Sequence, residues 1–211
     1  MDTALKHPFT AIVAGPTKAG KTVWVRKLVQ NLEQMVFPIP EEVYWCYSEW
    51  QPLYGEVEAT NSRVHFLQGL PDIQELKTGT EKPKLLILDD FMQEMKGDKR
   101  LVQLFTKGSH HWNVSIVHIV QNLFFDGLRT SRVNAQYLIL MKNPSDKLQA
   151  ATLAKQLYPG KTGYFMEAYT DACKDSYGYL FVDLCQETPE NMRLRTKVFP
   201  GELQIAYLPK T

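Results

Sequence analysis

Eight consecutive residues near the N-terminus have the types and spacing that bind a phosphate chain. They read Gly15-Pro16-Thr17-Lys18-Ala19-Gly20-Lys21-Thr22, which is G-x-x-x-x-G-K-T, the P-loop pattern. Glycines allow backbone N–H groups to close around phosphate oxygens, Lys21 would reach the β- and γ-phosphates, and Thr22 would place its hydroxyl on Mg²⁺. A glycine-rich turn without a ligand is the alternative interpretation.

A pair of carboxylates follows a strongly apolar run further along the chain. Four apolar residues, 85–88, precede Asp89 and Asp90 without any polar alternation. Such a run predicts a central parallel strand covered on both faces, with the carboxylates at its C-terminal end. Asp89 would hold Mg²⁺ or its water shell, and Asp90 would orient or deprotonate the attacking water. A solvated acidic turn is the alternative.

An amide stands at the end of another predicted strand. Residues 114–120 are mostly β-branched or apolar, and Gln121 follows them directly. In this position Gln121 could lie next to the γ-phosphate and sense it, or it could simply cap the strand end. The residue types alone do not separate these two roles.

The elements that must position these groups alternate between strand and helix patterns. Strands are predicted at about 9–14, 43–47, 85–90, 114–120 and 136–141, with a short apolar run at 64–67. Helices are predicted at about 22–35, 73–76, 99–109 and from 145 or 146 to 157. Two further strand patterns, 176–184 and 194–199, predict a terminal β-hairpin, and the last ten residues would form an arm. The pattern predicts an α/β fold with a mainly parallel sheet.

Length and composition are those of an ordinary globular chain. With 211 residues, 44% hydrophobic and 22% charged, one domain is expected. We expect its core at about 8–160 and a hairpin with an arm at about 161–211. No run approaches the roughly 20 apolar residues of a membrane span, and no signal-peptide pattern opens the chain. The expected location is therefore intracellular.

Charge is unevenly distributed although its sum is small. The net charge is +1, yet residues 41–81 carry eight acids and two bases, while residues 96–161 carry ten bases and three acids. A basic face that binds phosphate backbones is therefore permitted but not required.

Three classes of nucleotide-binding enzyme can be compared with these patterns. A GTPase needs Asp-x-x-Gly and Asn-Lys-x-Asp, but Met92 stands three residues after Asp89, and residues 143–146 lack the lysine. A small-molecule or nucleoside kinase should carry an arginine-rich lid, which is not visible. The remaining class is an ATP hydrolase with an additional strand between the P-loop strand and the strand ending at Asp89.

Taken together, four segments resemble a known group of motors. Residues 9–22, 85–90, 119–122 and 137–146 are similar to the FtsK–HerA superfamily, specifically the small poxvirus-type DNA-packaging ATPases of double-stranded DNA viruses and related elements. The resemblance implies a P-loop NTPase sheet of order 5-1-4-3-2. It also implies ATP and Mg²⁺ as cofactors, a pentameric or hexameric ring, and duplex DNA driven through its pore.

Further expectations follow from this resemblance. The chain would act inside the host cell at the viral assembly site, or be carried with the virion, and would meet a capsid or portal-vertex protein. Each site would take an arginine from the neighbouring subunit, for which Arg129 and Arg132 are candidates and Arg100 a weaker one. The alternative for these arginines is an exposed or salt-bridged surface position. Many relatives have glutamate where Asp90 stands, so its shorter side chain would need a bridging water or a neighbouring group.

Two other functions remain open from the sequence. A P-loop kinase acting on a nucleoside or another small molecule would need neither DNA nor a ring. A protein that uses nucleotide only as an assembly switch would bind ATP tightly without turnover.

Overall fold

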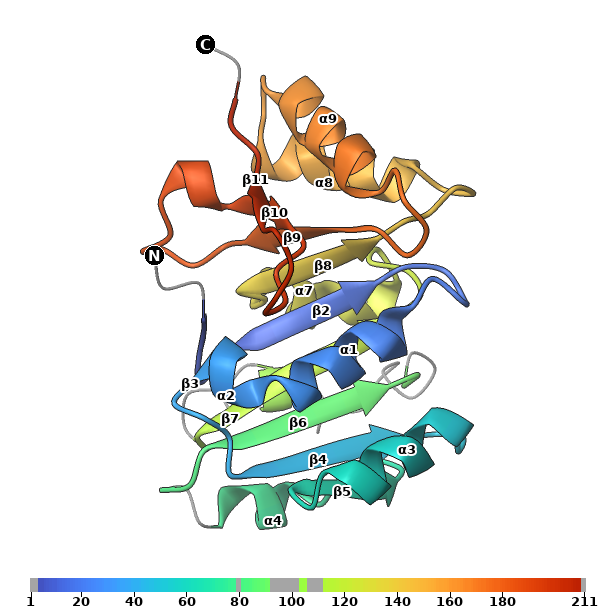
Figure 1. Cartoon of the computed structure of the whole chain (residues 1–211), viewed down its shortest axis with the longest axis vertical. Coiled ribbons are helices and arrows are strands. Elements are labelled where there is room, and N and C mark those ends of the chain that lie inside the picture. The colour runs from blue at the N-terminus through green and yellow to red at the C-terminus, as the bar shows by residue number, and fades with distance from the viewer. Residues whose placement is uncertain (1–3, 79–80, 92–102, 106–111, 210–211) are drawn as a thin grey trace.

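The computed structural model describes residues 4–78, 81–91, 103–105 and 112–209. Within them lies a nine-stranded sheet of order β11-β10-β9-β8-β2-β7-β6-β4-β5 (Figure 1). Its strands are β2 (Thr10–Ala14), β4 (Glu42–Tyr47), β5 (Val64–Gln68), β6 (Lys84–Asp89), β7 (Val114–Val120), β8 (Tyr137–Met141), β9 (Tyr179–Asp183), β10 (Leu194–Thr196) and β11 (Ile205–Ala206). The short strands β1 (Leu5–Lys6) and β3 (Val36–Phe37) pair with each other.

The predicted strand order is confirmed in the middle of this sheet. The five predicted strands are β2, β4, β6, β7 and β8, and they lie in the order β8-β2-β7-β6-β4, which is 5-1-4-3-2. All four pairings between them are parallel. β7 is the additional strand between β2 and β6. The apolar run at 64–67 is a sixth parallel strand, β5, at the edge next to β4.

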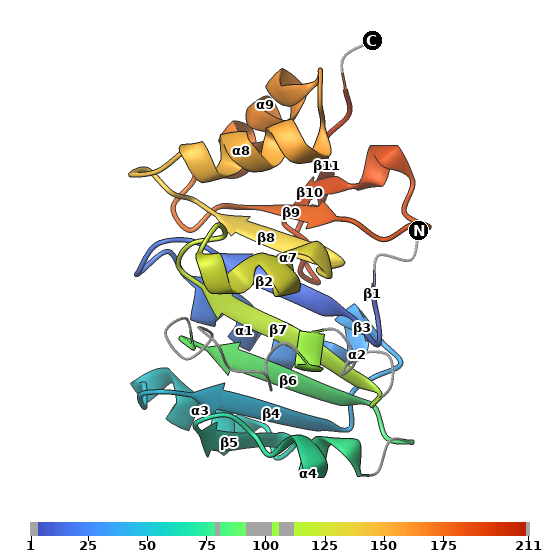
Figure 2. The ribbon, with the colours of Figure 1, turned by 180° about the vertical axis from the view of Figure 1, so that it is seen from behind.

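Helices cover both faces of the sheet. They are α1 (Lys21–Gln30), α2 (Leu32–Met35), α3 (Pro52–Thr60), α4 (Ile73–Lys77), α7 (Arg129–Val133), α8 (Leu148–Leu157) and α9 (Thr162–Ala172). α1, α2 and α3 lie in front of the sheet in Figure 1, and α7 lies on the opposite face in Figure 2. The helix predicted at 22–35 is interrupted at Asn31, whose side chain donates to the carbonyl of Lys27.

Two apolar clusters hold these layers together. Alternate residues of β2 point to opposite faces, so Ala11 and Val13 pack with α1 and α3, while Ile12 and Ala14 pack with α8 and α9. The central strands β6, β7 and β8 are buried along their whole length. This burial explains why they read as mainly apolar runs without regular polar alternation.

The C-terminal segment contains more regular secondary structure than the expected hairpin and arm. The hairpin of β9 and β10 is confirmed, and β9 also pairs antiparallel with β8. The last ten residues are not a free arm, because β11 pairs with β10. Helix α9 was not predicted, although Phe165, Ala168, Tyr169 and Ala172 are buried at helical spacing.

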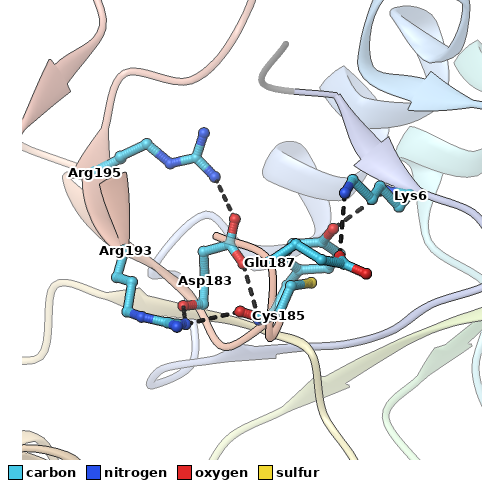
Figure 3. A network of polar contacts seen from close by, with 7 residues as sticks. Lys6, Asp183, Cys185, Glu187, Arg193 and Arg195 are labelled. Atoms are coloured by element: carbon cyan, nitrogen blue, oxygen red, sulfur yellow. Dashed lines mark hydrogen bonds and ion pairs between the residues drawn. The ribbon is translucent and has the colours of Figure 1, made fainter. Parts of the chain in front are cut away.

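Polar contacts join residues within this C-terminal part, and one ion pair links it to β1 (Figure 3). Arg195 Nη2 donates to Asp183 Oδ2 at 2.8 Å, and these side chains are only 4% and 7% exposed. Arg193 Nη1 donates to the carbonyl oxygens of Asp183 and Cys185. Lys6 and Glu187 form an exposed pair at 3.1 Å. Of these contacts, the Lys6–Glu187 pair joins segments that are 181 residues apart in the chain.

Two predictions cannot be compared with the described residues. Most of the helix expected at 99–109 lies outside them, as does Arg100. Among the helices that the structure describes, none is long and apolar enough to cross a membrane.

Candidate functional site

The P-loop connects β2 to α1 at the C-terminal edge of the parallel strands. Gly15 N–H donates to the carbonyl of Val120 on β7, which ties the start of the loop to the neighbouring strand. A Cβ on Gly15 would lie 2.6 Å from Met141 Cβ on β8. Only glycine therefore fits here, because a side chain would push β8 away from the loop.

The end of the loop exposes backbone donors. Gly20 has φ 92° and Lys18 has φ 65°, left-handed conformations that turn the backbone sharply before the helix. α1 begins at Lys21 with no side-chain cap and no acidic residue in its first turn. The first N–H groups of a helix have no intrahelical acceptor, so this end of α1 is suited to an anion.

Lys21 crosses the loop that it follows. Its Nζ donates to the carbonyls of Gly15 at 2.7 Å and Pro16 at 2.9 Å. Burial lowers the pKa of Lys21, and the nearby carboxylates of Asp89 and Asp90 act in the opposite direction. The ammonium group is thereby held inside the loop and beside the acidic end of β6.

Asp89 is buried at the end of β6 and is held by a tyrosine. The side chain is 3% exposed, and Tyr54 Oη donates to Asp89 Oδ2 at 2.9 Å. Burial raises the pKa of Asp89, while the hydrogen bond from Tyr54 and the charge of Lys21 lower it. Tyr54 lies on α3 and is fully buried. Sequence reasoning missed it, because nothing in the local pattern of α3 indicates a contact 35 residues away.

We expect Tyr54→Phe to weaken the response of ATP hydrolysis to Mg²⁺. Asp89 is predicted to hold the metal, and residues that orient a metal ligand typically contribute 10- to 100-fold in metal affinity or activity. The Mg²⁺ concentration for half-maximal hydrolysis should rise about 10-fold or more, which a magnesium titration of the ATPase rate would measure.

Tyr44→Phe provides the matched control for this change. Tyr44 also donates to a carboxylate, that of Glu42, but neither residue lines the pocket described below. Its variant should keep the normal magnesium dependence. An unchanged magnesium dependence in Tyr54→Phe would show that this hydrogen bond does not position Asp89 for metal binding.

Asp90 and Gln121 complete the acidic and polar side of the same site. Asp90 is exposed and has φ 64°, an uncommon backbone conformation for a residue other than glycine. Gln121 follows β7 and is also exposed. Backbone strain of this kind is typical of functional positions, where the surrounding structure holds it.

One pocket of about 890 Å³ brings most of the predicted residues together. Of the residues predicted from the sequence, those that line this pocket are Thr17, Lys18, Ala19, Gly20, Lys21, Thr22, Asp89, Asp90 and Gln121. Its size is that of a typical small-molecule site. In the described part of the chain, no group of three or more His, Cys, Asp or Glu residues could hold a metal ion. A metal here would therefore need Thr22, Asp89 and oxygens of its ligand.

The two candidate arginines lie elsewhere. Arg129 and Arg132 are on α7, and neither lines the pocket. Arg132 lies over the Phe124 ring, with 4.3 Å between the guanidinium carbon and the ring centroid, and hydrogen-bonds Gln156. A role in the pocket of the same subunit is thus not available to them in this arrangement.

Comparison with solved structures gives several likenesses over almost the whole chain. The DNA-packaging ATPase B204 of Sulfolobus turreted icosahedral virus matches with a TM-score of 0.59 and 12% identity, over 97% of this chain and 100% of that one. B204 of Sulfolobus turreted icosahedral virus 2, solved with ATP-gammaS, matches with a TM-score of 0.57 and 11% identity, over 96% and 98% of the two chains. This chain has the fold of the viral genome-packaging NTPases.

A related fold occurs in a larger protein. The cytoplasmic domain of EssC matches with a TM-score of 0.50 and 14% identity, over 96% of this chain and 40% of that one. Sequence comparison alone finds no matching family model and no matching curated protein. The likeness expected from the four sequence segments is confirmed at the level of the fold.

Proposed function

We propose that this chain is an ATP-hydrolysing DNA translocase that packages a viral double-stranded DNA genome into a capsid. The observation that carries the proposal is one pocket lined by the P-loop, Asp89, Asp90 and Gln121. This pocket lies in the fold shared with genome-packaging NTPases. The low identity to those proteins makes the site, rather than the likeness, the basis of the proposal.

The described residues divide the work of ATP hydrolysis between them. The backbone N–H groups at the start of α1 and Lys21 bind the phosphates, and Thr22 and Asp89 would hold Mg²⁺. When bound, Mg²⁺ would neutralise charge on the phosphate oxygens. Asp90 takes a proton from water as the water oxygen bonds to the γ-phosphorus. The bond from this phosphorus to the β–γ bridging oxygen then breaks, which leaves ADP and phosphate. Gln121 contacts the γ-phosphate.

Among the described residues, no arginine lines the pocket of a single subunit. Phosphoryl transfer in this type of motor is completed by an arginine that stabilises the transition-state charge, often from another subunit. A ring of identical chains joined head to tail would supply one at each interface. Arg129 and Arg132 are the candidates for this role, because neither lines the pocket of its own subunit.

Steady-state hydrolysis with and without DNA tests the translocase. We expect the purified chain to form rings with ATP, seen by electron microscopy, and to hydrolyse ATP faster when duplex DNA is added. Double-stranded DNA should stimulate more than the same mass of single strands. Binding should weaken as salt is raised, because phosphate contacts release counterions.

Other results would favour the other functions. Rings whose ATP hydrolysis does not respond to duplex DNA would reject translocation. Transfer of phosphate to a nucleoside by a monomer or dimer would indicate a kinase. Tight ATP binding that raises Tm without turnover would indicate an assembly switch.

A further inference from the structure

The pocket continues beyond the P-loop to a wall made by the C-terminal part of the chain. On this side it is lined by the turn between α9 and β9, which includes Asp175, Tyr177 and Gly178, and by the end of β10 and the residues after it, which include Thr196, Lys197 and Phe199. The acidic residues Asp89 and Asp90 lie at the end of β6, where the γ-phosphate is expected. The C-terminal wall is therefore available to the other end of a nucleotide.

Tyr177 presents an aromatic ring from this wall. The residue is 67% exposed, yet its ring reaches the P-loop, with Cδ1 3.2 Å from the position that a Cβ on Gly20 would take. Its φ of 60° is uncommon for a large side chain. Strained backbone positions are enriched at ligand-binding sites, where the surrounding structure holds them.

The turn that carries Tyr177 is firmly anchored. Lys142, directly after β8, holds this turn with three hydrogen bonds. Its backbone N–H donates to the Gly178 carbonyl at 2.8 Å. Its Nζ donates to the carbonyls of Lys174 at 2.8 Å and Asp175 at 3.2 Å. A Cβ on Gly178 would lie 2.5 Å from the Ala172 carbonyl oxygen. Close packing therefore fixes the backbone of the turn from which the ring projects.

We propose that the ring of Tyr177 is the surface on which the nucleobase of a bound nucleoside triphosphate stacks. The inference rests on the proposed nucleotide site and adds the part of that site that contacts the nucleobase. An aromatic ring stacks on any base, because every base has a flat π-face. Tyr177 therefore contributes affinity for ATP and GTP alike, and none for the phosphate chain alone.

Direct binding measurements separate the two ends of the ligand. With the full chain and Mg²⁺, isothermal titration calorimetry would compare ATP, GTP and inorganic tripolyphosphate. Tyr177→Asn removes the ring, and asparagine tolerates a positive φ. We expect Kd for both nucleotides to rise roughly 5- to 100-fold, with Kd for tripolyphosphate unchanged. Tyr177→Phe keeps the ring and should bind all three ligands normally.

A second variant and a control make the result decisive. Tyr177→Trp should bind ATP at least as tightly, and ATP but not tripolyphosphate should quench its added indole fluorescence. Val133→Asn changes another exposed residue, 73% exposed and outside the pocket, and should bind normally. Normal ATP affinity in Tyr177→Asn without quenching in Tyr177→Trp overturns the inference. Failure of the unchanged protein to bind either ATP or tripolyphosphate instead overturns the nucleotide site itself.

Discussion

An Asp90→Asn variant is expected to bind ATP normally and to hydrolyse it about 100- to 10,000-fold more slowly. Asparagine has nearly the same shape as aspartate but cannot take the proton that the attacking water must lose. Asp90 is exposed, so its replacement disturbs no packing. Asparagine also tolerates the φ of 64° at this position. Single-turnover hydrolysis and ATP binding, measured on the same protein, would check this separation.

Lys21→Ala is the comparison that makes the Asp90 result specific. Lys21 is the lysine of the loop whose ammonium group already lies at the loop carbonyls. Its loss should weaken ATP binding and also slow hydrolysis, because a charge-assisted contact to phosphate is removed. Equal loss of ATP binding in both variants would contradict the role of Asp90. Near-normal hydrolysis by Asp90→Asn would assign the water to another group.

Arg195→Met is expected to lower the free energy of unfolding by about 3–5 kcal/mol. Arg195 and Asp183 form a pair that is almost fully buried. Burial lowers the pKa of Arg195, and the Asp183 carboxylate opposes this shift. Removing the arginine leaves a buried carboxylate without its partner, which is costly. Urea denaturation of Arg195→Met and of the unchanged protein would measure the difference in the free energy of unfolding.

A double variant tests that the cost comes from the unpaired charge. In Arg195→Met with Asp183→Asn, the asparagine oxygen can still accept the hydrogen bond from Cys185 N–H, which Asp183 Oδ1 accepts at 3.0 Å. No charge is then left buried, so the double variant should be more stable than Arg195→Met alone. Lys6→Ala breaks an exposed pair and should cost at most about 1 kcal/mol. A double variant no more stable than Arg195→Met would contradict this account.

Much of the site could be predicted because phosphate binding uses local chemistry. The P-loop is a continuous segment, and β6 and β7 are buried on both faces, so their apolar runs and polar ends are visible in the sequence. The strand order of the core followed from the resemblance and is confirmed. The Asp90→Asn measurements test the role of Asp90, and the roles of Gln121, Arg129 and Arg132 stay predictions.

Other features were not predicted. Helix α9 begins shortly after Pro159 and Gly160, which end the preceding helix, and only the helical spacing of its buried residues indicates it. The two-residue strand β11 is too short to show any periodicity and is defined only by its pairing with β10. Its position depends on a partner strand and not on its own sequence.

By itself, the sequence predicted which residues bind phosphate and indicated which strands form the centre of the sheet, because both predictions depend on neighbours along the chain. Only the tertiary structure decided what surrounds those residues. The hydrogen bond of Tyr54 to Asp89 and the approach of Tyr177 to Gly20 join segments that are distant in the sequence. Such contacts are set by how strands and helices pack, and no local pattern of residue types encodes them.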